Sequence, residues 1–173
     1  SGFAPEKIYE VEGNWMTIQC PRRCHENLYP TLDLPNQLTA YAENGTIPTE
    51  KVPCCPVCGS PMNIHMALDG TFISDRKAAE RLERFIEKYH GKKLVILELG
   101  IGWRNQLIKA PFMGLAAREP RAAYIAVNRG EIYIPEEIQG KAIGLDGDVT
   151  DILKALRQLR WRMRKSRQDV RNM

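Results

Sequence analysis

Four cysteines in two close pairs are the residues of this 173-residue sequence whose spacing points most directly to chemistry. The pairs are Cys20-Pro-Arg-Arg-Cys24 and Cys55-Pro-Val-Cys58-Gly59. Each pair can bend the backbone so that two thiolates face one centre, and four thiolates suit Zn²⁺, which prefers tetrahedral sulfur ligation. Four protein ligands leave no open position for a substrate. We therefore predict a structural zinc site formed by Cys20, Cys24, Cys55 and Cys58.

Three neighbouring residues are alternative ligands for this site. Cys54 is the fifth cysteine, but its use would lengthen the spacing of the second pair, so we interpret it as the spare thiol. His25 and His65 are near enough in sequence to replace a cysteine. The short spacings and the lack of a secretory signal favour metal over disulfides, and with it a reducing cytoplasm. No stretch approaches the roughly 18 apolar residues that cross a bilayer, so no membrane partner is expected.

A glycine-containing turn is the second candidate site. Leu97-Glu98-Leu99-Gly100-Ile101-Gly102 ends an apolar run, and such a turn lets phosphate approach backbone N–H groups where a helix begins. The full dinucleotide fingerprint is absent, so an ordinary strand–helix turn remains an equal alternative. Asn128 and Arg129 follow the next apolar run, where Asn could bind a ribose or an adenine edge and Arg a phosphate. The alternative is plain turn chemistry in Asn-Arg-Gly.

The elements that would position this turn alternate between helix and strand. We expect helices at Asp75 to His90, Asn105 to Arg118 and Asp151 to at least Arg164, and strands at Leu94 to Leu99, Ala122 to Val127 and Ala142 to Leu145. Asp75 is the expected N-cap of the first helix and Gly91 its C-terminal glycine. The alternation predicts a doubly wound α/β layer with a parallel sheet covered on both faces. Three strands are few for such a sheet, which usually has five or six.

The first 75 residues have a different character. They hold eight of the eleven prolines and all five cysteines, with little helical periodicity. Lys7 to Cys20 predicts two short strands around a turn at Gly13-Asn14, and residues 30 to 52 predict turns and short helical pieces. The chain therefore divides in sequence near residue 75.

The net charge of +4 is concentrated at the C-terminal end. Residues 151 to 173 carry eight Lys or Arg against two Asp, a surplus of six, so the rest of the chain is slightly acidic. A zinc-ribbon module that binds nucleic acid through this basic helix is the alternative function, and its binding would depend steeply on salt. The simpler interpretation is a docked helix with a solvated basic face, because an apolar stripe runs through Ile152, Leu156, Leu159 and Met163.

The order of these signals resembles that of sirtuins, which are NAD-dependent deacylases and ADP-ribosyltransferases. Ser1-Gly2 and the stretch from Lys7 to Gly13 are similar to the Ala-Gly and strand-His-Gly segments that lead to the first zinc cysteine of the family. The four cysteines match its zinc ligands, although the x3 spacing of the first pair departs from the common x2. Gly100-Ile101-Gly102 stands where sirtuins have Gly-Thr-Ser, Asn128 where they have Ile-Asn, and Gly147-Asp148-Val149 at a late loop that touches adenine.

The resemblance implies a zinc ribbon at residues 1–75, the C-terminal half of a Rossmann-like NAD-binding domain at 76–160, and a basic helix end or tail at 161–173. It covers about half of the family domain. The Gly-Ala-Gly NAD loop and the Gln-Asn-x-Asp catalytic segment are not in this sequence, so we expect no catalytic residue here and no NAD turnover by the chain alone. The expected NAD contacts are Gly100, Ile101, Gly102, Asn105, Asn128, Arg129, Asp148 and Val149.

Details of three segments resemble the class M sirtuins of microbes. These are the x3 knuckle, the Glu-Leu-Gly-Ile-Gly-Trp form of the turn, and Ile-Lys-Ala-Pro-Phe-Met. That branch ADP-ribosylates a lipoyl-carrier protein and is encoded beside a macrodomain that reverses the mark. The resemblance therefore implies zinc and NAD as cofactors. The implied partners are a protein substrate, a macrodomain protein and the other half of the domain, while nucleic acid is not expected.

Overall fold

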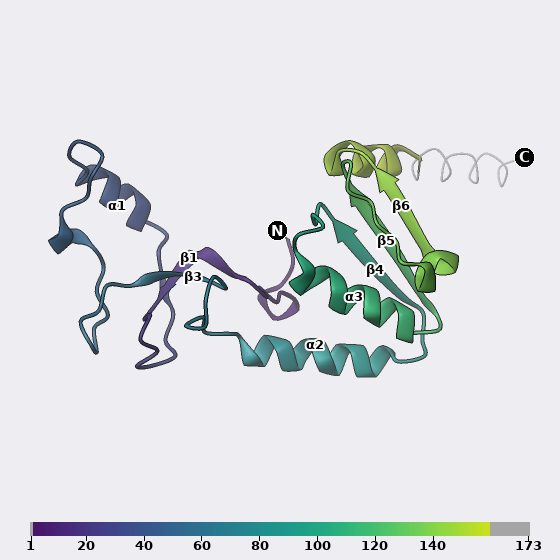
Figure 1. Ribbon diagram of the computed structural model, residues 1–173, viewed down its shortest axis with the longest axis horizontal. Helices are drawn as coiled ribbons and strands as arrows, with labels where there is room; N and C mark the ends of the chain where they lie inside the picture. The colour runs from purple at the N-terminus through teal and green to yellow at the C-terminus, as the bar shows by residue number, and fades with distance from the viewer. Residues whose placement is uncertain (1, 160–173) are drawn as a thin grey trace, which may run out of the picture. The chain divides into compact units, whose positions relative to one another are not determined.

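The computed structural model describes residues 2–159 of the chain (Figure 1). These residues divide into two compact units, of which the first is Ser1–Phe85 and the second begins at Ile86. The division falls inside the helix that the sequence predicts from Asp75 to His90. None of the helices described has the length and apolar character that a membrane span requires.

The first unit is built on an antiparallel sheet in the order β2-β1-β3. Its strands are β1 (Gly13–Gln19), β2 (Tyr29–Pro30) and β3 (Asn63–Met66), and Ile18 lies opposite both Tyr29 and Ile64. The irregular remainder holds η1 (Pro5–Lys7), α1 (Leu34–Ala40) and η2 (Thr49–Lys51). The last two are the short helical pieces predicted for residues 30 to 52.

The predicted hairpin within residues 7 to 20 is wrong. Gly13 begins β1 instead of turning the chain, and its N–H donates to the Glu10 carbonyl to close a turn before the strand. The partners of β1 come from β2 and β3, and β3 lies some 45 residues further along the chain (Ile18 pairs with Ile64). Local sequence pattern cannot show such pairing, because strand partners are chosen by the tertiary fold.

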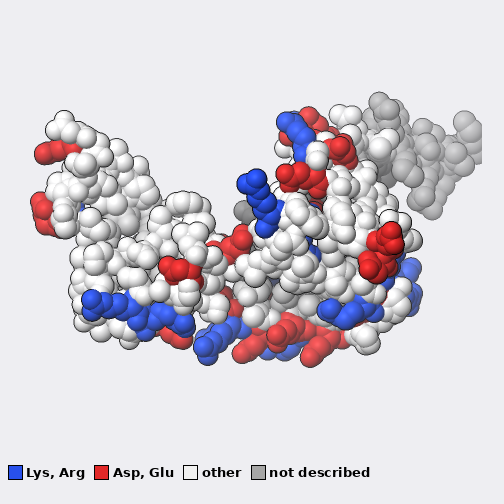
Figure 2. Space-filling view, in the orientation of Figure 1, with Lys and Arg blue, Asp and Glu red and all other residues white. Residues whose placement is uncertain are grey.

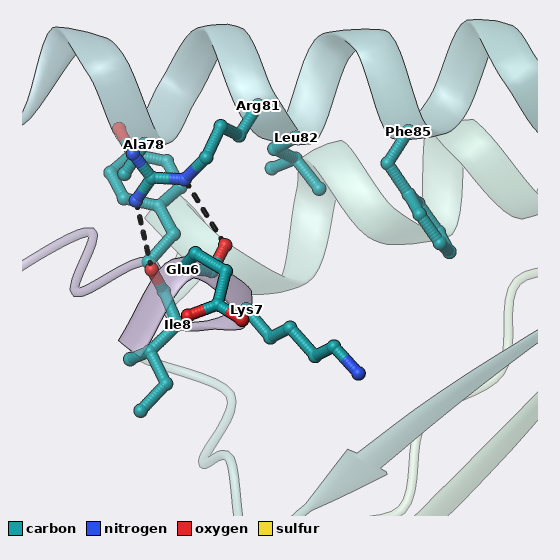
Figure 3. A pocket seen from close by; sticks show the side chains of 8 residues that line it. Glu6, Lys7, Ile8, Ala78, Arg81, Leu82 and Phe85 are labelled. Carbon is teal, nitrogen blue, oxygen red and sulfur yellow. Dashed lines mark hydrogen bonds between the residues drawn. The ribbon is translucent and has the colours of Figure 1, made fainter. Parts of the chain in front are cut away.

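Helix α2 (Arg76–Tyr89) is confirmed together with both of its predicted ends. Asp75 accepts a hydrogen bond from the Ala78 N–H at 2.9 Å, and Gly91 has the positive φ of +67° that a C-terminal glycine takes. Within the first unit, Arg81 fastens the N-terminal segment to this helix. Its Nε donates to the Glu6 carbonyl at 3.1 Å and its Nη2 to the Ile8 carbonyl at 3.5 Å (Figure 3).

A hollow of about 460 Å³ lies beside this contact (Figure 3). Its walls come from the segment Glu6, Lys7, Ile8 and Tyr9 and from the α2 side chains Ala78, Arg81, Leu82 and Phe85. Two N–H groups of Arg81 donate to backbone carbonyls, so the guanidinium holds the two sides of this wall together.

The second unit contains a parallel sheet in the order β4-β5-β6, which confirms the predicted α/β class (Figure 1). The strands are β4 (Leu94–Leu99), β5 (Ala122–Asn128) and β6 (Ala142–Asp146). Between them lie α3 (Gln106–Arg118) and η3 (Glu136–Lys141), and a helix runs from residue 149 to 159. The rest of the predicted C-terminal helix lies outside the described residues.

The core of this unit fills one face of the sheet. Met113 and Ala116 of α3 and Ile138 of η3 pack on Tyr124 and Ala126 of β5. On the other face, Val95 and Leu97 of β4 and Ile143 of β6 remain 63%, 51% and 57% exposed. The expectation that β4 is covered on both faces is therefore wrong for residues 2–159, because α3 and η3 pack against the same face.

Glu119 holds the start of this unit in place, and its contacts should make the stability of the unit depend on pH. One carboxylate oxygen bonds His90 Nδ1 and the other accepts the Gly91 N–H, each at 2.9 Å, and the side chain is buried. The His90 hydrogen bond, followed by that of the Gly91 N–H, lowers the pKa of Glu119 below its ordinary 4.5. The carboxylate therefore contributes its whole stabilisation above pH 4.5, and this stabilisation is lost as the pH falls through the lowered pKa.

We expect Glu119→Gln to lower the free energy of unfolding at pH 7, because the amide has one oxygen where the carboxylate has two. It can accept only one of these hydrogen bonds, and less strongly than a carboxylate does. The gap between variant and wild type should close on acidification below pH 4.5. Urea unfolding at pH 7 and at pH 3.5 checks this. A gap that stays constant across this range would mean that the carboxylate charge is not what stabilises the contact.

Candidate metal centre and nucleotide site

The four predicted cysteines lie together in the first unit. One ligand atom from each of Cys20, Cys24, Cys55 and Cys58 falls within 4.8 Å of the others. The Sγ atoms of Cys20 and Cys24 are 3.5 Å apart, those of Cys20 and Cys58 3.6 Å, and those of Cys24 and Cys55 3.6 Å. Four sulfurs at about 2.3 Å from one Zn²⁺ would stand about 3.8 Å apart in a tetrahedron. The cluster is thus able to hold a metal ion of this kind.

Two tight turns bring the thiols together. In the first knuckle the Arg23 N–H donates to the Cys20 carbonyl, and Arg23 itself takes a positive φ of +48°. In the second, the Gly59 N–H donates to the Cys55 carbonyl, and Gly59 has a φ of +71°. Glycine adopts this conformation without steric cost, which explains its place directly after Cys58.

Hydrogen bonds within the knuckles favour thiolates. The Ser60 side chain and then its backbone N–H lower the pKa of Cys58 to about 6. The Cys24 backbone N–H is the main cause that lowers the pKa of Cys20. Burial, followed by hydrogen bonds with the neighbouring thiols, raises the pKa of Cys24 to about 12. Because the thiolate is the metal ligand, the shifts favour cation binding near neutral pH at Cys20 and Cys58 and oppose it at Cys24.

The three alternative ligands have other surroundings. Cys54 lies outside the cluster, and its thiol donates to the Val52 carbonyl at 3.4 Å. His65 is buried, with Nε2 donating to the Ile73 carbonyl at 2.7 Å and Nδ1 3.2 Å from the Thr17 hydroxyl. His25 stands beside the cluster, with Nε2 3.3 Å from Cys55 Sγ. Its place is that of a neighbour that hydrogen-bonds a ligand sulfur.

The glycine turn lies at the carboxyl end of the parallel sheet. Gly100 has a φ of +65°, and its N–H donates to the Val127 carbonyl at 2.8 Å. Asn128 donates from Nδ2 to the Ile101 carbonyl at 2.9 Å, so it ties the turn to the end of β5. Asn105 ends the turn as the N-cap of α3 and accepts the Ile108 N–H. The first turn of α3 therefore begins where the glycines end, as the phosphate interpretation requires.

The loops after β5 and β6 meet the same end of the sheet. Arg129 Nη2 lies 3.1 Å from Asp148 Oδ2, with both side chains partly exposed. A Cβ on Gly100 would lie 3.6 Å from Val149 Cγ2. Asn128 and Asp146 are partners in the strand register. The structure thus gathers all eight predicted nucleotide residues at the carboxyl end of the parallel strands. The contacts among them come from the three loops that follow β4, β5 and β6.

The sequence is similar to those of two known proteins. A protein ADP-ribosyltransferase of Staphylococcus aureus is 28% identical over 151 residues, which are 84% of this chain and 48% of that protein. A probable bifunctional ADP-ribose hydrolase/ADP-ribosyltransferase of Fusarium oxysporum f. sp. cubense is 25% identical over 162 residues, 86% of this chain and 27% of that protein. The chain spans less than half the length of these relatives. No family model matches the sequence.

Solved structures decide the fold. Sir2Tm bound to a propionylated peptide, and Sir2 with a p53 peptide and NAD+, match with a TM-score of 0.54 at 20% identity. The match covers 87% of this chain and 54% of those chains. The chain has a sirtuin-like fold. The parallel sheet and its flanking helices belong to the Rossmann-like part of that fold.

One residue beside the glycine turn was not predicted from the sequence. Glu131 accepts the Trp103 N–H at 2.9 Å, and the same Oε2 would lie 2.9 Å from a Cβ placed on Gly102. It therefore closes the glycine turn from the side of β5. The signal in the sequence is only an acidic residue soon after a strand, which is common in loops.

The basic C-terminal end falls largely outside the residues that the structure describes. Residues 160–173, with most of its Lys and Arg, lie outside the described residues. On the face that Figure 2 shows, acidic and basic side chains of the described residues are intermixed. The described residues therefore show, on this face, no extended basic surface of the kind that nucleic acid would need.

Proposed function

We propose that this chain forms the metal-binding ribbon and the adenosine and phosphate side of an NAD site in a sirtuin-type ADP-ribosyltransferase. The observation that carries the proposal is the meeting of the β4, β5 and β6 loops around a glycine turn, in a chain 28% identical to a protein ADP-ribosyltransferase. The ribbon would take up residues 1–75 and the NAD-binding half 76–160, with 161–173 as a basic end.

Each side chain of the site has a task in this proposal. Gly100, Ile101 and Gly102 leave room for phosphate at the N-terminus of α3, which Asn105 caps. Asn128 at the end of β5 and Glu131 in the loop after it hold the turn in shape. Arg129 is paired with Asp148 at the rim and can turn its guanidinium to a phosphate. In the reaction, the bond between nicotinamide and ribose breaks and ADP-ribose passes to a protein acceptor.

Zinc is the metal proposed for the four-cysteine cluster, and its role there is structural. Four thiols with Sγ separations near 3.6 Å suit tetrahedral Zn²⁺. We also propose a reducing, cytoplasmic setting, which the five free thiols support.

The acceptor and partners follow from the class M resemblance. We propose a lipoyl-carrier protein as the acceptor and a macrodomain protein as the partner that removes the mark. Support for the second comes from the Fusarium relative, whose name joins an ADP-ribose hydrolase to an ADP-ribosyltransferase. The relatives are longer than the region that matches this chain. We propose that the other half of the domain, added to this chain, would supply the catalytic groups.

Titration with ADP-ribose tests the nucleotide proposal. We expect amide shifts at residues 100–105 and 128, with a dissociation constant in the millimolar range, or about 4 kcal/mol of binding. Gly102→Trp should abolish binding, because the indole would fill the space where backbone and phosphate must meet.

Gly140→Trp is the matched control, because a Cβ there meets nothing within 4 Å and Gly140 lies in η3. It should bind ADP-ribose as the wild type does. Shifts confined to Arg157 and the residues after it, with a steep loss at higher salt, would support the nucleic-acid alternative and contradict this function.

A further inference from the structure

Three buried polar side chains meet beneath the glycine turn, one from each of three elements. They are Glu98 of β4, Lys109 of α3 and Tyr124 of β5, which are 5%, 1% and 1% exposed. Lys109 Nζ pairs with Glu98 Oε1, and the Tyr124 hydroxyl donates to Glu98 Oε2. The three side chains satisfy one another's hydrogen bonds, and the described residues leave no buried side-chain polar atom without a partner.

Burying this network costs desolvation free energy that an apolar core would not. Taking a carboxylate and an ammonium out of water costs several kcal/mol each, and well-packed apolar side chains of similar size are often equally stable in such a place. Around it the core is apolar, with Met113, Ala116 and Ala126 close by. Stability alone therefore does not account for the charges, and what they gain is a fixed geometry.

The geometry that they fix is the base of the glycine turn. Glu98 and Lys109 are eleven positions apart, so the ion pair closes a loop whose tip carries Gly100 and Gly102. Lys109 lies one turn after the cap of α3, since its N–H donates to the Asn105 carbonyl. Tyr124 then ties the closed loop to the central strand of the sheet.

The rim of the same loop is held separately. The Gly100 N–H donates to Val127, Asn128 donates to Ile101, and Glu131 accepts from Trp103. The Glu131 contact is exposed and the Asn128 contact is partly buried, whereas both contacts at the base are buried. The loop is thus anchored rigidly at its base and more loosely where a ligand would enter.

We propose that Glu98, Lys109 and Tyr124 form a positioning network that holds the glycine turn and the first turn of α3 at the spacing that pyrophosphate requires. None of the three touches the nucleotide, because all are buried below the turn. The ammonium of Lys109 is neutralised by Glu98 and acts only through the backbone that it fixes. This inference rests on the proposed nucleotide function.

An apolar replacement of the whole network separates positioning from stability. The variant combines Glu98→Leu, Lys109→Met and Tyr124→Phe, so that no buried charge or hydroxyl is left without its partner. We expect it to melt at or above the wild-type temperature, while its affinity for ADP-ribose falls by on the order of tenfold, since small displacements of a binding loop are costly. Amide hydrogen exchange in residues 100–105 should become faster.

Glu119→Gln is the matched control, because Glu119 is a buried carboxylate at the opposite end of β4, where it bonds the Gly91 N–H. It should leave ADP-ribose affinity and exchange at residues 100–105 unchanged. A loss of affinity in this control equal to that of the triple variant would show that general loosening is the cause, and would overturn the proposal.

The remaining outcomes are distinct. If the triple variant binds ADP-ribose as tightly as the wild type, the positioning role is refuted and the proposed function stands. If the wild type itself does not bind ADP-ribose, the proposed function fails and this inference fails with it. If the triple variant does not fold, Tyr124→Phe decides, because it removes only one hydroxyl. Faster amide exchange at residues 100–105 together with weaker ADP-ribose binding would support the network. No change in either measurement would overturn it.

Discussion

Replacing Cys58 with serine should release the metal and unfold residues 15 to 60. The four thiols converge within 4.8 Å, and the chain between the two knuckles has only short helices and strands to hold it. Metal binding in small thiolate sites is worth about 10 kcal/mol or more, and that energy is folding energy when the site does not exist in the unfolded chain. Elemental analysis should find one zinc per wild-type chain and none in the variant, with loss of protected amides in β1 and β3.

Cys54→Ser is the control for this experiment. Cys54 lies next to Cys55 in sequence but outside the cluster, and its thiol only donates to the Val52 carbonyl. It should keep both the metal and the melting temperature. A Cys58→Ser protein that melts like the wild type and retains a full equivalent of zinc would contradict the assignment of this ligand.

Gly13→Ala should be the most damaging single-methyl change outside the metal centre. Gly13 has a φ of +75°, and a Cβ there would lie 2.2 Å from the His65 carbonyl oxygen and 2.9 Å from Phe72 Cε2. The backbone conformation costs about 1–2 kcal/mol for an L-residue, and forced overpacking adds about 1–3 kcal/mol. The His65 carbonyl oxygen belongs to β3, so the pairing of β3 with β1 would have to shift. We therefore expect the free energy of unfolding of the first unit to fall by about 3 kcal/mol or more.

Gly45→Ala separates the two causes. Gly45 has a similar φ of +79°, but a Cβ there meets nothing within 4 Å. It should therefore lose only the backbone part, about 1–2 kcal/mol. Urea unfolding, followed by amide exchange in β1 and β3, measures both. Equal losses in the two variants would mean that the close approach of β1 to β3 does not limit this position.

Signals that act over a few residues predicted their elements well. Asp75 caps the start of α2 by accepting the Ala78 N–H, and Gly91 takes the positive φ with which the chain leaves the helix. The apolar run from Leu94 to Leu99 is β4 without a shift at either end. Sequence patterns are reliable here because the interactions that decide these ends are local.

Pairings between distant residues could not be predicted in the same way. β1 finds its partners in β2 and β3, so the expected hairpin around Gly13-Asn14 does not form. His65, an alternative metal ligand by sequence, is buried between Thr17 and the Ile73 carbonyl. The chemistry of an imidazole is the same in a metal site and in a core, and only its neighbours distinguish the two.

Features that depend on residue spacing along the chain could be predicted from the sequence: two cysteine knuckles, capped helices, and a parallel α/β unit with a glycine turn after β4. Tertiary structure decided which of these residues meet. It brought four thiols to one centre, placed the loops of β4, β5 and β6 at one edge, and joined Glu98, Lys109 and Tyr124 beneath the turn. Knuckle turns and helix caps depend on neighbours in the chain. The meeting of the two knuckles and the buried ion pair depend on packing that brings distant residues together, and the ion pair also requires that water be excluded from both charges.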